Sequence, residues 1–208
     1  MATSEKIAIV DYGAGNLHSV LGALARAGAS ARVATSPADL GGADGIILPG
    51  VGAFGYAAEE LAKSGFSDTL CAEARRGTPL FGICLGMQLL FAESEESPGA
   101  RGLGILPGRV TLLQTGGLKT PHMGWSDLHV SGGALTAGVD EGAFVYFVHS
   151  FGVHSEGCAV AQATYGETFD AAVERGNVFG TQFHPEKSSA VGAHILDNFL
   201  QYVKEARA

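Results

Sequence analysis

The chain has 208 residues, of which 46% are hydrophobic and 16% are charged, and its formal net charge is −8. This composition excludes a disordered polypeptide, and a chain of this length can bury a core without disulfide or metal cross-links. The acidic balance argues against nucleic-acid binding, because neutralising phosphate groups requires a basic surface.

The first predicted elements are a strand and a helix. The N-terminal sequence MATSEKIAIVDYG contains an apolar run that is too short for a signal peptide, and we expect Lys6–Val10 to form a buried strand. Asn16 is suited to cap a helix that passes through Val20 and Leu24 and stops near Gly28.

Strand and helix signals continue to alternate through the first half of the chain. Further strands are expected at residues 31–35, 45–48 and 80–83, and further helices at residues 54–63, 67–76 and 85–92. Pro49 and Gly50 are expected to end the third strand. Strands that alternate with helices predict a doubly wound sheet of parallel strands.

The pattern changes after Pro98. Strand-like segments then follow one another with only turns between them, at residues 109–113, 144–148, 159–161, 171–173 and 178–183. Short connections of this kind predict antiparallel pairing. A closing helix is expected after Ser188 or Ser189, because apolar residues from Val191 to Val203 recur at helical spacing.

We therefore predict a single α/β domain over residues 1–208, with a mixed, mostly parallel central sheet flanked by helices and antiparallel strands in the second half. No apolar run is long enough to cross a bilayer, so no membrane association is expected. Cys71, Cys84 and Cys158 form no CxxC pair, which favours a reducing, cytoplasmic compartment. The histidines lack a ligand spacing such as HExxH, and we expect neither a metal nor another cofactor.

Cys84 lies at a predicted strand-to-helix junction, within the sequence PLFGICLGMQLL. Gly82-x-Cys84-x-Gly86 has the form of a nucleophile elbow with sulfur in place of the hydroxyl. The helix dipole favours a thiolate there, and the N–H of Leu85 is suited to stabilise an oxyanion. The alternative is that Cys84 is inert core packing, which is the commoner role of a free cysteine.

A base for this thiol is expected at the end of a later strand, in the sequence FHPE. In an extended chain, alternate residues point to the same face, so His184 and Glu186 are predicted to lie side by side. Glu186 would then orient the imidazole while its other nitrogen faces Cys84, as in a catalytic triad. The alternative is an ordinary turn that ends a strand.

Two further segments follow predicted strands. Residues 49–52 would lie beside the elbow, because the carboxyl ends of parallel strands share one edge of a sheet, and the N–H groups of Val51 and Gly52 are candidate oxyanion donors. A plain turn is the alternative. Residues 11–16 suggest a phosphate-binding loop, but His18 stands where the third glycine of GxGxxG would be, so nucleotide binding is not favoured.

The motifs resemble those of the class I, or triad, glutamine amidotransferases. The elbow GICLGMQ and the later HPE match that superfamily in type and order. Within it, the chain is similar from end to end to the glutaminase subunits of imidazole glycerol phosphate synthases. The segments that carry this likeness are residues 11–17 (DYGAGNL), 48–54 (LPGVGAF), 119–125 (KTPHMGW), 146–151 (YFVHSF) and 182–188 (QFHPEKS).

The resemblance implies a mechanism for hydrolysing glutamine. Cys84 attacks the side-chain amide, His184 moves the proton and Glu186 orients His184, through a thioester that water then cleaves to glutamate. It also implies a set of substrate-binding residues: Gly50, Val51, Gly52, Leu85, Gln88, Glu96, Ser150 and Phe151. Among them, the oxyanion donors at Val51 and Gly52 are expected to be misaligned in the isolated subunit. Phe151 stands where many relatives have tyrosine, so its main-chain contacts are the ones expected to persist.

The resemblance further implies a partner, the cyclase subunit of imidazole glycerol phosphate synthase, which is a (βα)8 barrel. Ammonia would pass to that barrel in a heterodimer that makes imidazole glycerol phosphate and aminoimidazole carboxamide ribonucleotide in histidine biosynthesis. Asn16, Trp125, Tyr146 and Lys187 match positions near the subunit interface. The alternatives are core packing for Trp125 and Tyr146, and a solvated cation for Lys187.

Other functions stay open on these residues alone. The chain is alternatively the glutaminase subunit of another biosynthetic amidotransferase, or a cysteine amidohydrolase acting on other amides. A binding or regulatory protein with an inactive triad is the third alternative, and intact Cys84, His184 and Glu186 argue against it.

Overall fold

The computed structural model describes residues 6–207. The signal-peptide expectation rests partly on residues 1–5, which lie outside the described residues, as does residue 208. The strands are β1 Lys6–Val10, β2 Ser30–Ala34, β3 Gly45–Gly50, β4 Leu80–Cys84, β5 Gly108–Leu112, β6 His122–Asp127, β7 His129–Val130, β8 Phe144–His149, β9 Phe151–Ser155, β10 Ala159–Tyr165, β11 Glu167–Arg175 and β12 Val178–Thr181. The helices are α1 Leu17–Arg26, α2 Phe54–Lys63, α3 Phe66–Arg76, α4 Leu85–Gln88 and α5 Ser189–Ala206, with single 3₁₀ turns at Pro37–Leu40 and Pro185–Lys187.

A ten-stranded sheet runs through the molecule in the order β2-β1-β3-β4-β12-β11-β10-β7, with β9 and β5 attached beside β11. The five strands from β2 to β12 are parallel to one another, and the strands beyond β12 are antiparallel. A separate two-stranded sheet joins β6 to β8. The predicted α/β architecture with a mixed sheet is confirmed.

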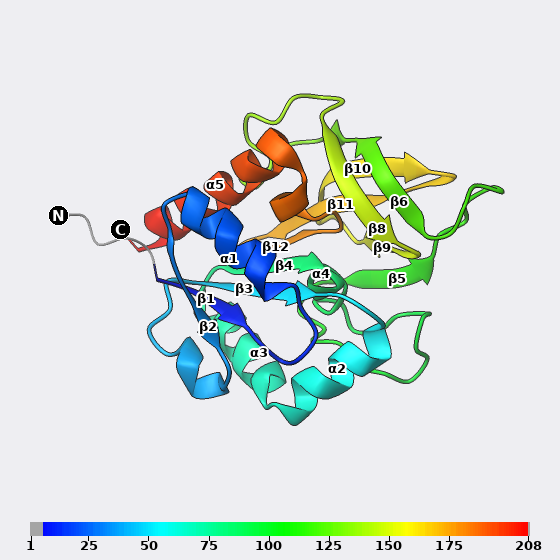
Figure 1. The fold of residues 1–208 in the computed structure, drawn as a ribbon. Coiled ribbons are helices and arrows are strands. Elements are labelled where there is room, and N and C mark those ends of the chain that lie inside the picture. Colours follow the sequence, from blue (N-terminus) through cyan, green and yellow to red (C-terminus); the bar gives the residue numbers. More distant parts are fainter. Residues whose placement is uncertain (1–5, 208) are drawn as a thin grey trace.

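Helices cover both faces of the parallel half (Figure 1), where α1 and α5 lie on one face and α2 and α3 on the other. Strand β1 shows why, because Ile7 and Ile9 enter the core under α1 and α5, whereas Ala8 and Val10 enter the core under α2 and α3. Successive residues of a strand point to opposite faces, so a strand covered on both sides must be apolar throughout. Strands β3 and β4 are accordingly buried along their whole length.

The structure differs from the sequence expectations mainly where the chain turns. The helix predicted for residues 85–92 ends at Gln88, because the carbonyls of Leu89 and Leu90 accept hydrogen bonds from Leu103 and Ile105 instead of continuing the helix. Strand β3 extends through Gly50, since Pro49 and Gly50 still pair with β4.

Three strands were absent from the sequence prediction, namely β6, β7 and β9. Strand β7 has only two residues, β6 (HMGWSD) and β9 (FGVHS) contain several polar or glycine residues, and none of the three presents an apolar run. The last strand of the sheet ends at Thr181, two residues before the predicted end, and gives way to the 3₁₀ turn at Pro185–Lys187. No helix within residues 6–207 is long and apolar enough to cross a membrane.

Glycines allow α4 to lie unusually close to the sheet. A Cβ atom on Gly82 would lie 2.6 Å from the carbonyl oxygen of Gly86, and one on Gly180 would lie 2.7 Å from Met87 Cγ. A Cβ atom on Gly86 would collide with the carbonyl oxygen of Leu48 in β3. The two glycines that flank Cys84 are therefore required by packing, and not only by the conformation of the turn.

We expect Gly86→Ala to lower the free energy of unfolding by about 1–3 kcal/mol, because the added methyl group meets backbone of β3 that cannot yield as a side chain would. Urea unfolding of the two proteins measures the difference. Gly22→Ala is the matched control: its Cβ atom meets nothing closer than 3.5 Å in α1, so the same change should raise stability by up to about 1 kcal/mol. Equal stability of Gly86→Ala and the unmodified protein would contradict the packing argument.

Candidate active site

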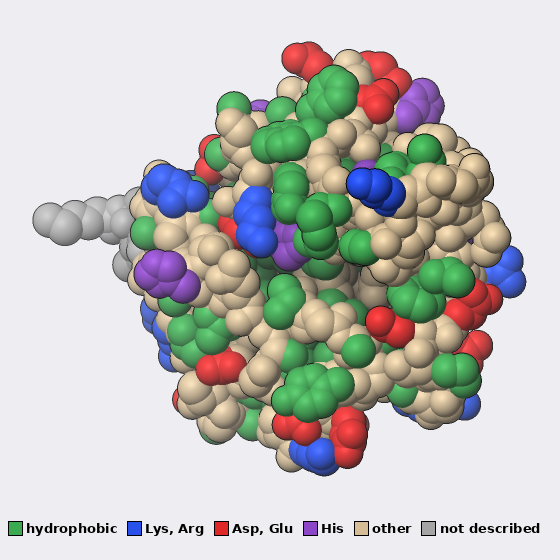
Figure 2. All heavy atoms as spheres, turned by 45° about the vertical axis from the view of Figure 1, so that its right-hand side comes forward, with side chains coloured by type: hydrophobic (Ala, Val, Ile, Leu, Met, Phe, Trp, Pro, Cys, Tyr) green, Lys and Arg blue, Asp and Glu red, His purple; other side chains and the backbone are tan. Residues whose placement is uncertain are grey.

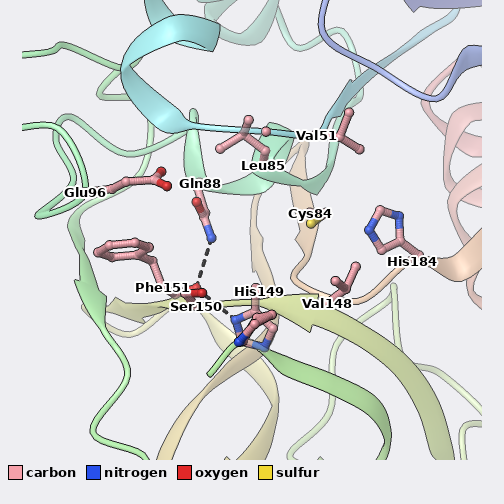
Figure 3. A pocket seen from close by; sticks show the side chains of 12 residues that line it. Val51, Cys84, Leu85, Gln88, Glu96, Val148, His149, Ser150, Phe151 and His184 are labelled. Carbon is pink, nitrogen blue, oxygen red and sulfur yellow. Dashed lines mark hydrogen bonds between the residues drawn. The ribbon is translucent and has the colours of Figure 1, made fainter. Parts of the chain in front are cut away.

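A cavity of about 290 Å³ opens where β3, β4 and β12 end. It contains every sequence-predicted catalytic or substrate residue except Gly50, which lies behind the wall and pairs with Cys84, and Glu186, which lies behind His184. Figure 3 shows Cys84 and His184 on one side and Gln88, Glu96 and Phe151 on the other. The lining residues are Val51, Gly52, Cys84, Leu85, Gln88, Glu96, Pro121, Val148, His149, Ser150, Phe151 and His184.

Cys84 is the last residue of β4 and immediately precedes α4. Its φ of 55° and ψ of −111° place a non-glycine residue in a region that L-residues seldom adopt. Such backbone strain persists only where the surrounding structure imposes it, and it costs on the order of 1–3 kcal/mol. The close packing of α4 imposes it here, and the turn directs the sulfur into the cavity (Figure 3).

His184 and Glu186 form the predicted pair. His184 Nδ1 lies 2.8 Å from Glu186 Oε1, and the two side chains are only 3% and 2% exposed. The pair does not sit in an extended strand as expected, because Glu186 belongs to the 3₁₀ turn that starts at Pro185. The contact is nevertheless confirmed, and it leaves the other ring nitrogen of His184 on the side of Cys84 (Figure 3).

The protonated form of His184 is favoured in this setting. Burial by itself lowers the pKa of His184, but hydrogen bonds to Cys84 and Glu186 and the charges of both groups outweigh it and raise the pKa from 6.5 to about 9. A base with this pKa favours transfer of the thiol proton to the imidazole. The cysteine, histidine and carboxylate thus form a unit in which a proton can be taken up and returned.

Gln88 presents a polar group to the cavity in a fixed orientation. Its Nε2 donates to the carbonyl of Phe151 at 3.0 Å and to Gln182 Oε1 at 3.0 Å. Both amide hydrogens are thereby used, so Oε1 is the atom left to accept a hydrogen bond from a ligand. Gln182 also donates to Cys84 Sγ at 3.8 Å, which ties the thiol to the same network.

Glu96 joins the cavity to the N-terminus of α2. Its Oε2 accepts a hydrogen bond from the N–H of Phe54 at 2.7 Å, and Ser97 Oγ accepts one from Gly55 at 3.0 Å. Ala53, the residue before α2, has no side chain able to do this. The carboxylate is therefore held at the cavity wall, where its negative charge suits a cationic ligand group.

The segment of residues 50–52 is braced from the loop after β1. The hydroxyl of Tyr12 donates to the carbonyl of Pro49 at 3.0 Å, and burial together with the nearby Cys84 raises the pKa of Tyr12. The N–H of Val51 donates to the carbonyl of Ala14 at 3.3 Å. The predicted oxyanion donor at Val51 is thus engaged with another part of the chain.

Gln182 and several wall residues were missed by the sequence reasoning. Gln182 lies two residues before His184, so the same alternation that paired His184 with Glu186 was the signal available for it. Val148, His149 and Pro121 lie in segments that carry the family resemblance, but the sequence gives none of the three a role in the cavity. Within residues 6–207, no group of three or more His, Cys, Asp or Glu side chains is arranged to hold a metal ion.

The residues expected near an interface occupy different settings. Trp125 is 51% exposed, so the core-packing alternative is wrong for this residue. Its ring contacts that of Tyr146 edge-on, with 6.1 Å between the ring centroids. Lys187 is exposed, and Asn16 caps α1 by accepting from the N–H of Ser19 at 3.4 Å. Figure 2 shows hydrophobic side chains gathered around a hollow on one face. Exposed apolar side chains on strands β6 and β8 and beside the cavity include Met123, Trp125, Phe144 and Val51.

Comparison with known proteins gives consistent matches along the chain. A family model described as glutamine amidotransferase class-I matches residues 8–203. The imidazole glycerol phosphate synthase subunit HisH of Halobacterium salinarum is 49% identical over 205 residues, covering 94% of this chain and 93% of the relative. HisH of Syntrophotalea carbinolica is 49% identical over 202 residues, covering 93% and 98%. The resemblance inferred from the motifs is confirmed.

Solved structures share the fold at lower identity. A chain in the structure of PurLQS from Thermotoga maritima superposes with a TM-score of 0.77 at 23% identity, covering 96% of this chain and 99% of that one. A crystal structure of a glutamine amidotransferase gives a TM-score of 0.76 at 22% identity, covering 95% and 98%.

We expect the imidazole of His184 to titrate at about 9, well above its ordinary 6.5, in NMR spectra of the protein labelled at histidine. Glu186→Gln should lower that midpoint, because the amide does not stabilise the imidazolium as the carboxylate does. Glu141→Gln, which removes an exposed carboxylate that contacts His129, is the control and should leave the His184 midpoint unchanged. A wild-type midpoint at or below 6.5 would contradict the proposed charge state.

Proposed function

The chain belongs to the class I glutamine amidotransferases and, within them, to the family of the imidazole glycerol phosphate synthase subunit HisH, and from this premise we propose that it is the glutaminase subunit of such a synthase. The observation that carries the proposal is the position of Cys84, on a strained turn beside the buried His184–Glu186 pair and facing a cavity with an amide acceptor. Residues 1–208 act as one glutaminase domain.

The reaction begins with proton transfer from the thiol of Cys84 to His184. The carboxylate of Glu186 stabilises the resulting imidazolium through its hydrogen bond to Nδ1. The sulfur attacks the side-chain amide carbon of glutamine and forms a tetrahedral intermediate. His184 returns the proton to the departing nitrogen, so that ammonia leaves and a thioester remains. Water then attacks the thioester with His184 as base, which releases glutamate and regenerates the thiol.

The cavity wall supplies groups that match the two ends of glutamine. Gln88 Oε1 is placed to accept a hydrogen bond from a donor on the ligand, and Glu96 to pair with the α-ammonium group. Ser150 and Phe151 offer main-chain groups beside Gln88. The N–H groups of Leu85 and of residues 50–52 are the donors proposed for the oxyanion of the tetrahedral intermediate.

Ammonia is passed to a cyclase subunit, a (βα)8 barrel that forms a heterodimer with this chain in the cytoplasm. The products there are imidazole glycerol phosphate and aminoimidazole carboxamide ribonucleotide, in histidine biosynthesis. Exposed aromatic and apolar side chains beside the cavity support an interface on this face, with Asn16, Trp125, Tyr146 and Lys187 as contacts. Such side chains are enriched in the buried centres of protein interfaces.

The hydrogen bond from Val51 to Ala14 supports a low activity of the isolated chain. While this N–H is engaged, it is withdrawn from the oxyanion of the intermediate. Loss of one oxyanion donor typically costs about 10²- to 10³-fold in rate. Docking of the partner would have to change the conformation of residues 50–52 to restore the donor.

We expect Cys84→Ala to reduce glutamine-dependent ammonia release by at least about 10³-fold, because the nucleophile is lost. The assay measures ammonia and glutamate from the chain in complex with the barrel partner. Cys158→Ala is the matched control, since Cys158 is buried outside the cavity and its loss should leave turnover nearly unchanged. Persistent activity of Cys84→Ala, or a preference for other amides over glutamine in a substrate panel, would overturn the proposal.

We also expect the chain to co-purify with the barrel subunit and to hydrolyse glutamine about 10²-fold faster in the complex with the nucleotide ligand of the barrel than alone. The reason is the engaged N–H of Val51 in the isolated chain. Steady-state glutamate production by the chain alone, by the complex and by the complex with nucleotide separates these states. Equal turnover in all three states would contradict the expected activation by the partner.

A further inference from the structure

A chain of hydrogen bonds runs from strand β6 to the cavity wall through side chains that the mechanism does not use. His149 Nδ1 lies 2.8 Å from the carbonyl oxygen of Phe151, and His149 Nε2 lies 3.0 Å from His122 Nδ1. His122 Nε2 in turn lies 2.9 Å from Ser126 Oγ. His122 and His149 face each other in the β6–β8 register, and Figure 3 shows His149 below the cavity.

The chemistry of the last acceptor sets the direction of the whole chain. A carbonyl oxygen only accepts, so the proton between His149 and Phe151 must be on His149 Nδ1. A neutral His149 then accepts at Nε2, which requires a proton on His122 Nδ1. His122 accordingly accepts at Nε2 from the hydroxyl of Ser126. All donors therefore point from β6 toward the cavity.

Both imidazoles are held neutral, as this arrangement requires. Burial lowers the pKa of His149 to about 3, and the nearby His122 and His184 add to the effect. Burial likewise lowers the pKa of His122 to about 4. A neutral imidazole is a donor at one nitrogen and an acceptor at the other. The nitrogen at which each ring accepts therefore determines the nitrogen from which it donates to the next group.

Aromatic packing prevents the His122 ring from turning out of this position. The ring of His122 is stacked on that of Tyr165, with 4.1 Å between the ring centroids and 17° between the ring planes. It is also stacked on Phe147, with a centroid distance of 4.9 Å and an interplanar angle of 25°. Phe169 contacts the edges of both histidine rings. The two histidines are only 2% and 7% exposed, so water does not compete for their nitrogens.

The chain ends on a main-chain group that shapes the cavity. The carbonyl of Phe151 accepts from both His149 Nδ1 and Gln88 Nε2, which occupies its two lone pairs. With this carbonyl fixed on two sides, the peptide groups of Ser150 and Phe151 that line the cavity have a set orientation. A flexible segment here would have to be ordered each time a ligand binds, at a cost in affinity.

We propose that His122 and Ser126 are positioning residues for substrate binding: they fix the tautomer of His149, which in turn holds the Phe151 carbonyl and the main chain that receives the amino-acid end of the substrate. The identity of that substrate, glutamine, rests on the proposed function. Neither His122 nor Ser126 lines the cavity, so the proposed effect is indirect and passes through the hydrogen bond from His122 to His149. The expected consequence of breaking the chain is weaker substrate binding with little change in the chemical step.

The kinetic test compares two substitutions at His122 in the complex with the barrel partner. His122→Phe keeps a ring to stack on Tyr165 but removes the donor to His149, and it should raise KM for glutamine by about tenfold with kcat within about twofold. His122→Asn places an amide donor near the position of Nδ1 and should restore most of the loss. His129→Phe, at an exposed histidine outside the cavity, is the matched control and should leave KM unchanged.

The spectroscopic test does not depend on the substrate. Nitrogen-15 spectra of the unmodified protein at neutral pH should show His122 and His149 both protonated at Nδ1 and unprotonated at Nε2. In His122→Phe, His149 should no longer be confined to this single tautomer. A proton on His149 Nε2 in the unmodified protein, or an unchanged KM in a folded His122→Phe, would overturn the proposal. An inactive complex with the expected tautomers would instead count against the proposed function.

Discussion

The site depends on the close approach of α4 to the sheet. Three glycines, Gly82, Gly86 and Gly180, remove the side chains that would otherwise separate the helical turn from β3, β4 and β12. The chain can make this approach only by placing Cys84 in a strained conformation, which turns its sulfur outward. Because β4 lies between β3 and β12, the sulfur meets the loop of residues 50–52 on one side and His184 on the other.

The buried ionisable groups of the site divide into two kinds. The pair of His184 and Glu186 concentrates charge next to the thiol, where a proton must be taken and returned. His122 and His149 stay neutral because burial opposes their protonation, and the imidazoles of His122 and His184 add to this effect at His149. In the proposed mechanism one imidazole therefore works as a base, and in the proposed positioning chain the other two work as directional hydrogen-bonding groups.

Strand β6 links the two surfaces on which the proposed function depends. Its successive side chains point in opposite directions, so Trp125 is half exposed on the outer side while His122, three positions away, is buried on the inner side. Strand β8 repeats the arrangement with Tyr146 and His149. A partner that covered the outer side of this small sheet would contact the same strands whose inner side is proposed to position the main chain of Ser150 and Phe151.

The sequence by itself determined the elements whose signals are local. Apolar runs placed β1, β3 and β4, glycine spacing predicted the turn at Cys84, and the short interval between His184 and Glu186 predicted the contact of these two side chains. The family followed from the same motifs, because their residues are contiguous. The end of α4 at Gln88 was beyond sequence reasoning, since the competing hydrogen bonds come from Leu103 and Ile105.

Only the tertiary structure decided how distant side chains combine. Gln182 reaches Cys84 across 98 positions of sequence, and Gln88 reaches the carbonyl of Phe151 across 63. The engagement of Val51 with Ala14 and the polarity of the His122–His149 chain are likewise properties of contacts between separate segments. Such contacts leave no periodic trace in the sequence, because they depend on which strands pair and in which register, and both are settled only when separate segments pack together.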